Sequence, residues 1–179
     1  MRVNEGRWTS HVDGGFVVLL LGVHPANPLA GLRAAPVLGR MVRVLEDLER
    51  DPHLGLLGHQ RHGGRRGVIV QYWRSAEALE RVALDATSVS ADVWRAWFGS
   101  GDGTGGRAGF WHETFRVGAG EYDAAYRDVP AIGLLRAGVP APVSDRPSVP
   151  RHRLPADEGL PRSPGPDAAS PDGDPSPPA

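Results

Sequence analysis

The chain has 179 residues, of which 40% are hydrophobic, and it carries a formal net charge of -1. This balance provides no basic surface for nucleic acid and no polybasic membrane anchor, so neither partner is expected. There is no cysteine, and all 20 residues counted as lysine plus arginine are arginine. Thiol nucleophiles, disulfides, cysteine-ligated zinc, iron–sulfur clusters and the lysine Schiff base of pyridoxal phosphate enzymes are therefore excluded.

Residues 1–14, with Trp8 as their one large apolar group, are expected to form an N-terminal arm. The apolar run from Phe16 to Val23 does not alternate with polar residues, which predicts a strand buried on both faces. The run is too short to cross a membrane, follows Asp13-Gly14-Gly15 instead of a basic segment, and precedes no cleavage site of small residues. We therefore expect no membrane span and no signal peptide, and a cytoplasmic protein.

A loop at 24–28 and a long helix are predicted next. Pro36 suits the first turn of this helix, and Asp51-Pro52 ends it. Its apolar positions keep helical spacing and are Val37, Met41, Val44, Leu45 and Leu48. A hairpin follows, because two strand-like runs, 54–60 and 67–73, flank the turn residues His62-Gly63-Gly64.

The later part of the domain adds helices, a loop and strands. In chain order they are a helix from Ala76 to Leu84 capped by Ser75, a helix from Ala91 to Phe98 capped by Ser90, a glycine-rich loop at 99–106, a strand from Ala108 to Val117 and an extended segment from Tyr122 to Val129. The order β-α-β-β-α-β predicts an α+β protein of the ferredoxin-like split type, with helices on one face of an antiparallel sheet. The other face needs a cover, and a second copy of the chain is the economical one. We expect a homodimer in which two sheets close a barrel-like core.

The composition changes sharply near Gly138. From Val139 onward the chain has twelve of its 17 prolines and no aromatic residue. Such a segment buries too little apolar area to offset its ordering entropy. The predicted organisation is therefore an N-terminal arm at 1–14, a ferredoxin-like domain at 15–137 and a proline-rich disordered tail at 138–179.

The segment from Gly109 to Phe115 holds a histidine and a carboxylate among aromatic residues on a predicted strand. Strand alternation puts His112 on one face and Glu113 on the other, so their side chains cannot be assumed to converge. His112 is the leading candidate for a general acid or base, although a histidine hydrogen-bonded in the core or at an interface would give the same pattern. Glu113 either pairs with an arginine or lies in an apolar pocket.

Arg74 closes the third predicted strand. It is a candidate partner for Glu113, an anchor for an anionic substrate, or a solvated residue at a strand end. Aromatic residues cluster in the later part of the domain and are predicted either to line a flat hydrophobic small-molecule site or to pack in the core. The candidates for substrate binding are Tyr72, Trp73, Arg74, Trp97, Trp111 and Tyr126. No metal site is predicted, because no carboxylate stands at ligand spacing from His53, His59 and His62.

Five segments together resemble a family of monooxygenase-like proteins. They are Leu54 to Gly58, Gln71 to Ser75, Trp94 to Trp97, Gly109 to Phe115 and Tyr126 to Pro130. The family, formerly catalogued as a domain of unknown function, includes the polyketide oxygenase of the fumagillin pathway. It is similar to the dimeric α+β barrel proteins of the antibiotic-biosynthesis monooxygenase type. The resemblance runs from about Phe16 to Leu134.

The resemblance implies a homodimer and, for some members, oxygen chemistry without flavin, metal or haem. In that chemistry an electron-rich substrate is deprotonated and its carbanion meets O₂, so the protein provides a base and a dry pocket. An oxidoreductase is implied that acts without a cofactor on a hydrophobic, polyketide-like molecule of secondary metabolism, with His112 as the proton-transfer group and Glu113 or Arg74 orienting. Two alternatives stay open: a haem enzyme of the same barrel superfamily, of the dehydratase or peroxidase type, and a dimeric protein that binds a small molecule without transforming it.

Overall fold

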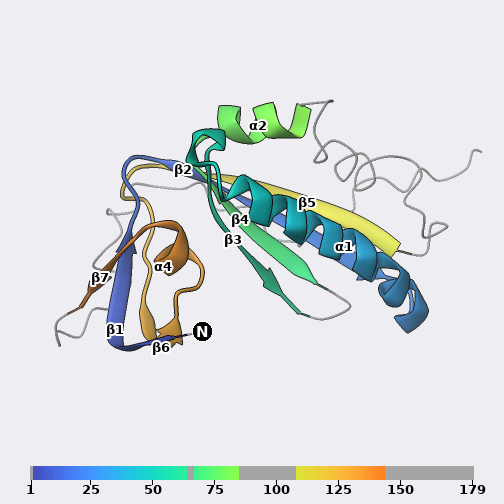
Figure 1. The fold of residues 1–179 in the computed structure, drawn as a ribbon, viewed down its shortest axis with the longest axis horizontal. Coiled ribbons are helices and arrows are strands. Elements are labelled where there is room, and N and C mark those ends of the chain that lie inside the picture. The colour runs from blue at the N-terminus through green and yellow to red at the C-terminus, as the bar shows by residue number, and fades with distance from the viewer. Residues whose placement is uncertain (1, 64–66, 85–107, 144–179) are drawn as a thin grey trace, which may run out of the picture.

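The computed structural model describes residues 2–63, 67–84 and 108–143. Its larger sheet has four antiparallel strands in the order β3-β4-β2-β5 (Figure 1). These strands are β2 (Phe16–Pro25), β3 (Leu56–His62), β4 (Val68–Trp73) and β5 (Ala108–Val117). The four strands predicted for this sheet are confirmed, with ends that differ by two residues at most.

The strand β2 lies between β4 and β5, which explains its unbroken apolar run. On one face Val17, Leu19 and Leu21 are buried in the main core. On the other face Val18 and Leu20 are half-buried. Both faces of this central strand carry apolar side chains, so the strand's own sequence does not favour one register over a register shifted by one residue. The pairing with β4 and β5 sets the register.

The helix α1 (Pro28–Leu48) begins eight residues before Pro36, which the sequence predicts to lie in the first turn of this helix. Asn27 caps it by accepting a hydrogen bond from the backbone nitrogen of Ala30 at 2.9 Å, and Pro28 occupies the first turn. Pro36, which we placed in the first turn, lies inside the helix. The helix continues through this proline because Ala34, Val37 and Leu38 on either side are buried against the sheet, and this packing offsets the hydrogen bond that proline cannot make.

The helix α2 (Ala76–Leu84) has the predicted bounds, and the Ser75 hydroxyl accepts a hydrogen bond from the nitrogen of Ala78 at 3.2 Å. A short 3-10 helix, η1 (Pro52–Leu54), connects α1 to β3. Both α1 and α2 lie on the same side of the four-stranded sheet (Figure 1). The main core fills the space between these two helices and the sheet. Its most deeply buried side chains include Leu19, Leu21, Leu38, Met41, Leu45, Ile69 and Trp73.

The element order of the larger sheet and its helices is that of an α+β, ferredoxin-like fold, as predicted. The predicted helix at 91–98 and the glycine-rich loop at 99–106 lie outside the described residues. Among the residues that are described, no helix is long and apolar enough to cross a membrane. The face of the larger sheet opposite α1 and α2 is called the open face below.

A second sheet of three strands, in the order β6-β1-β7, was not expected. Its strands are β1 (Val3–His11), β6 (Tyr126–Pro130) and β7 (Val139–Pro142), and the short helix α4 (Leu134–Ala137) precedes β7. The N-terminal arm is therefore a strand, and the first residues of the predicted tail form another strand beside it. Each pairs with a partner more than 100 residues away in the sequence, for example Trp8 with Tyr126 and with Pro142.

The small sheet and α4 cover one end of the open face (Figure 1). A second apolar cluster joins the two layers, and its members are Val12, Phe16, Ala124 and Leu134, with Val18, Leu57, Tyr72, Val117, Tyr122 and Tyr126 packed against them. The Tyr122 hydroxyl accepts a hydrogen bond from the nitrogen of Val12 at 2.6 Å. At this end the chain itself supplies the cover that was expected from a second copy.

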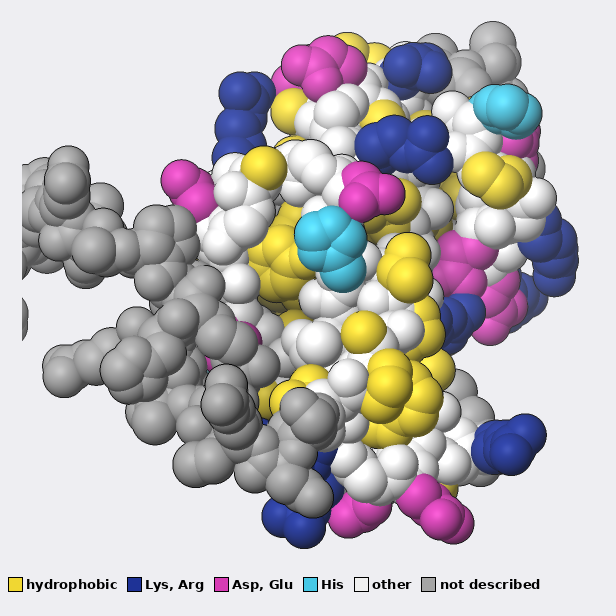
Figure 2. Space-filling model, turned by 90° about the vertical axis from the view of Figure 1, so that its left-hand side faces the viewer, with side chains coloured by type: hydrophobic (Ala, Val, Ile, Leu, Met, Phe, Trp, Pro, Cys, Tyr) yellow, Lys and Arg dark blue, Asp and Glu magenta, His cyan; other side chains and the backbone are white. Residues whose placement is uncertain are grey.

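The outer side of this small layer is not uniformly polar. Figure 2 views the molecule from the side where the small sheet lies in Figure 1, and on this face apolar side chains stand among arginine, acidic and histidine side chains.

Candidate functional site

The register of β5 against β2 assigns a face to each residue of the predicted catalytic pair. His112 lies opposite Leu21, which is buried beneath the helices, whereas Glu113 lies opposite Leu20. Directly opposed residues of an antiparallel pair share a face. His112 therefore belongs to the helix-covered face and Glu113 to the open face, and both side chains are exposed at this edge strand. The structure does not bring the two groups together.

Glu113 stands in an apolar setting on the open face. The register places Glu113, Leu20, Val70 and Gln60 in one row across the four strands. On either side of Glu113 along β5 are Trp111 and Phe115, which share its face, and Phe115 is 49% exposed. A carboxylate at this position can act as a general base towards a ligand that lies on the open face.

Trp111 lies flat over the next row of the open face. A β-carbon added at Gly22 would come within 2.0 Å of the Trp111 ring, so the indole occupies the space that a side chain at position 22 would take. Glycine at this position is what lets the ring approach the sheet. Trp111 thus lies beside Glu113 on the open face, and its role as a substrate-binding residue stays a prediction.

Tyr72 and Tyr126 come together at the other end of the open face. Tyr72 belongs to β4 and Tyr126 to β6 of the small sheet, and both side chains are half-buried. Burial raises the pKa of the Tyr72 phenol, and the neighbouring Tyr126 raises that pKa further. Both tyrosines therefore border the same seam between the two layers, and their role as binding residues stays a prediction.

Trp73 lies elsewhere. It is fully buried in the main core beneath the helices, and its ring nitrogen donates a hydrogen bond to Oε1 of the equally buried Gln71 at 2.9 Å. The Nε2 atom of Gln71 has no hydrogen-bond partner within the described part of the chain. Trp73 therefore acts as a core residue and not as a wall of the open face. Trp97, the remaining predicted aromatic contact, lies outside the described residues.

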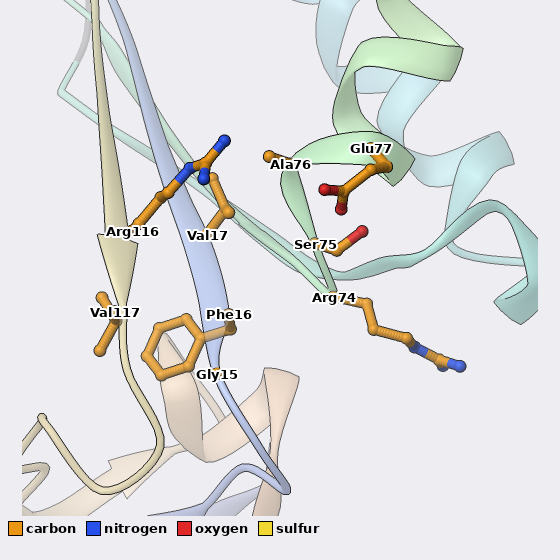
Figure 3. Close-up of a pocket in the computed structure, with 9 residues that line it drawn as sticks. All are labelled: Gly15, Phe16, Val17, Arg74, Ser75, Ala76, Glu77, Arg116 and Val117. Carbon is orange, nitrogen blue, oxygen red and sulfur yellow. The ribbon is translucent and has the colours of Figure 1, made fainter.

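Arg74 is exposed at the end of β4 and borders two surface hollows. One, of about 210 Å³, is also lined by Arg116 and by the first turn of α2 (Figure 3). The other, of about 450 Å³, is also lined by His11, Asp13 and Val139. In Figure 3 Arg116 extends toward Ala76 and Glu77, whereas Arg74 extends away from Arg116.

The charges around these hollows are already balanced in part. Hydrogen bonds from the Glu77 backbone and from the Ser75 side chain lower the pKa of Glu77, and the charge of Arg116 lowers it further to a smaller extent. The Nε2 atom of His11 lies 3.0 Å from a carboxylate oxygen of Asp13, and both side chains are largely exposed. Arg74 forms no ion pair with Glu113 in the structure, so that predicted pairing is not observed.

Two residues of the seam were missed by sequence reasoning. The Gln60 side-chain oxygen accepts a hydrogen bond from the nitrogen of Gly133 at 2.8 Å, which ties the loop before α4 to β3. Gly133 has a φ of 56°, a conformation that favours glycine. No local pattern marks either residue, because the contact joins positions 73 residues apart. Among the described residues no group of three or more metal-ligating side chains lies together.

Comparisons with known proteins agree with this fold. No curated protein matches the chain. Among solved structures the chain is similar to an aldoxime dehydratase (OxdRE) in complex with butyraldoxime, with 19% sequence identity and a TM-score of 0.58. The match covers 84% of this chain and 43% of the dehydratase chain, so this chain spans less than half the length of that protein.

A family model also matches the chain. It is described as monooxygenase af470-like and covers residues 16–134, from the first residue of β2 to the first residue of α4. The match therefore includes the whole larger sheet, Glu113 and both seam tyrosines, and it excludes β1 and β7. Since it spans well over half of the sequence, the chain belongs to the monooxygenase af470-like family.

Proposed function

We propose that this protein is a monooxygenase that oxidises a hydrophobic, enolisable, polyketide-like small molecule without a cofactor. The observation that carries the proposal is Glu113, a carboxylate placed among Trp111, Phe115 and Leu20 on the open face. Membership of a monooxygenase family supports the reaction class. The flat, partly aromatic face supports an apolar substrate with fused rings.

The open face would be completed by a second copy of the chain. Val18, Leu20, Val68 and Val70 are only half-buried in a single chain, and Phe115 is largely exposed. An apolar sheet face of this kind is normally covered by another layer. Two open faces packed against each other would enclose a cavity with Glu113 at its edge and exclude water from it.

The proposed reaction needs only a base, the substrate and O₂. The Glu113 carboxylate removes a proton from an acidic C–H₂ group, and the resulting carbanion gives one electron to O₂ and then combines with the superoxide so formed. The peroxide breaks its O–O bond as the second C–H proton leaves, and the products are a ketone and water. The substrate supplies all the electrons, so R₂CH₂ and O₂ give R₂C=O and H₂O.

His112 takes a secondary place in this proposal. Its strand position directs it toward the helix-covered face, and its exposure at the β5 edge allows proton exchange with solvent. We assign proton abstraction to Glu113 and keep for His112 only proton exchange with solvent on the helix-covered face, outside the cavity. Substitution of Glu113 should therefore slow the reaction more than substitution of His112.

Anthrone is a suitable test substrate, since its CH₂ group is acidic and its oxidation gives anthraquinone and water. Glu113→Gln should lower kcat by roughly 100-fold or more, as expected for loss of a general base, while His112→Ala should lower it less. Oxygen uptake and anthraquinone absorbance measure the rate. Glu121→Gln, which changes a carboxylate in the turn after β5, is the matched control and should leave kcat unchanged. An unchanged rate in Glu113→Gln would remove Glu113 from the mechanism.

The haem alternative requires a histidine able to reach the cavity. Of the described histidines, His24 and His62 share the open face by register, at the end away from the seam, and both are exposed. An imidazole there would hold the haem iron, which would supply dehydratase or peroxidase chemistry, and the similarity in fold to an aldoxime dehydratase supports this alternative. A Soret band in the purified protein that is lost in His24→Ala or His62→Ala would contradict the cofactor-free proposal. Binding of anthrone without its oxidation would instead favour the remaining alternative, a protein that binds a small molecule without transforming it.

A further inference from the structure

Two tyrosine hydroxyls meet beside Gly133, at the seam between the open face and the small sheet. A β-carbon placed on Gly133 would lie 3.0 Å from the hydroxyl oxygen of Tyr126 and 3.4 Å from that of Tyr72. The hydroxyls come from different layers of the fold, since Tyr72 belongs to β4 and Tyr126 to β6. Both oxygens therefore border one small space next to the glycine.

Neither of these hydroxyls has a hydrogen-bond partner within the part of the chain that the structure describes, although both side chains are half-buried. Tyr122, in the same apolar cluster, is different: its hydroxyl accepts from the nitrogen of Val12 and reaches the carbonyl of Ser10. The hydroxyl oxygens of Tyr72 and Tyr126 are not among the buried atoms that lack a partner, so both oxygens keep contact with solvent. Two solvent-accessible phenol hydroxyls beside one glycine, with no partner among the described residues, are available to donate to a bound molecule.

Gly133 keeps that space open. Its φ of 56° and ψ of -136° lie in a region that residues with a side chain rarely adopt. Its nitrogen donates to Gln60, so the loop is held against β3 and not free to collapse onto the phenols. Any side chain at this position would fill the space between the two hydroxyls.

We infer that Tyr72 and Tyr126 form a paired hydrogen-bond-donor site for a single oxygen of the ligand, either a ketone oxygen or the enolate or phenolate oxygen derived from it. The site rests on the proposed function for its role in the reaction, because enolate charge develops on such an oxygen when Glu113 removes the neighbouring proton. Donors aimed at a developing oxyanion are a general means of stabilising such a transition state. Binding of the oxygen does not depend on that role.

The electrostatics of the seam suit this role. Burial, and secondarily the neighbouring Tyr126, raises the pKa of the Tyr72 phenol, so it stays protonated and remains a donor at neutral pH. Tyr72 stands two strands and one row away from Glu113, which standard sheet spacings convert to about 12 Å between backbones. With side chains reaching inward from both ends, a molecule of two or three fused rings spans this interval.

The test uses 4-nitrophenol as a chromophoric oxygen ligand for the full-length protein. Binding is followed by the absorbance change of the phenolate in wild type, Tyr72→Phe, Tyr126→Phe and the double variant. Each single substitution should weaken phenolate binding by about tenfold or more, as expected for loss of a hydrogen bond to a charged acceptor. The fraction bound as phenolate should also fall at a given pH.

Tyr122→Phe is the matched control, because it removes a hydroxyl that is already paired within the fold. It should lower the free energy of unfolding and leave phenolate affinity unchanged, whereas Tyr72→Phe and Tyr126→Phe should keep or raise that free energy because their hydroxyls have no partner to lose. Unchanged phenolate affinity in both seam variants, or an equal loss in Tyr122→Phe, would overturn the inference.

The outcomes also separate this site from the proposed oxidation. If the seam variants lose phenolate binding while Glu113→Gln leaves anthrone oxidation unchanged, the oxygen site stands and the proposed function fails. If Glu113→Gln abolishes oxidation while the seam variants bind 4-nitrophenol and oxidise anthrone as wild type does, the proposed function stands and the oxygen site fails.

Discussion

Single residues set the polarity of the open face. Glu113 and Gln60 stand at opposite edges of one row, with the aliphatic side chains of Leu20 and Val70 between them. The side-chain oxygen of Gln60 accepts a hydrogen bond from the nitrogen of Gly133. Glu113 is the charged residue of that row. A flat apolar ligand laid along the row would therefore meet a carboxylate at one edge and the seam phenols near the other.

The raised pKa of Tyr72 predicts a loss of stability in alkali. In the unfolded chain the Tyr72 phenol ionises near its ordinary value of 10.0, whereas burial and Tyr126 disfavour its ionisation in the folded protein. The folded state therefore holds this proton more tightly, and its advantage falls as pH rises above that value. Urea unfolding between pH 8 and pH 11 should show a smaller decline in Tyr72→Phe than in wild type. Equal declines in the two proteins would contradict this expectation.

At the scale of elements, a polar link joins three segments. Glu49, just after α1, accepts a hydrogen bond from the nitrogen of His59 at 2.9 Å, and the same carboxylate oxygen lies 2.9 Å from Nδ1 of that ring. Its other oxygen lies 2.5 Å from Nη2 of Arg136 in α4. His59 is buried and Arg136 is 42% exposed, so this link connects the long helix, β3 and the second layer from the interior out to the surface.

Removing the centre of this link should cost more than removing its exposed end. Glu49→Ala leaves both the nitrogen and the ring of buried His59 without this partner, which we expect to lower the free energy of unfolding by about 2–3 kcal/mol. Arg136→Ala removes a side chain that is 42% exposed and should cost about 1 kcal/mol or less. Denaturant unfolding of the two variants gives the comparison, and equal losses would show that His59 does not depend on Glu49.

The sequence predicted the elements that local signals define and missed those that depend on distant partners. Apolar runs, periodicity and a capping serine mark β2, β5 and α2. The bounds of β5 and α2 agree with prediction, and β2 extends two residues beyond its predicted end. The strands β1 and β7 have little apolar signal of their own and exist through pairing across the length of the domain. The start of α1 was misplaced because proline is equally suited to a helix start and to a break.

The candidate site shows the same division. Alternation along β5 was enough to predict that His112 and Glu113 diverge, but only the register with β2 decides which face each takes. Trp73 and Tyr72 are neighbours in sequence, yet one is core and the other borders the seam. The seam glycine could not be found from its local sequence, because its contacts with Gln60 and Tyr72 are long-range.

At the scale of the whole molecule, the open face should hold two copies together. Val70 lies near the centre of this face and is half-buried in one chain, so Val70→Glu would place a charge inside the proposed interface. Sedimentation should show wild type at twice the 19.1 kDa chain mass and Val70→Glu at the chain mass. Leu84→Glu, at a position 79% exposed at the end of α2, is the control and should stay dimeric. A monomeric wild type at micromolar concentration would contradict the dimer.

The pairing of β1 with β6 and β7 has a practical consequence for laboratory production of the protein. A fragment trimmed to the family match at 16–134 would lack β1 and β7, leaving β6 with no strand beside it and uncovering Phe16. An unpaired strand next to newly exposed aromatic surface promotes aggregation. The shortest fragment worth expressing therefore begins before Val3 and ends after Val143, whose nitrogen still donates to the carbonyl of Arg7 at 2.9 Å.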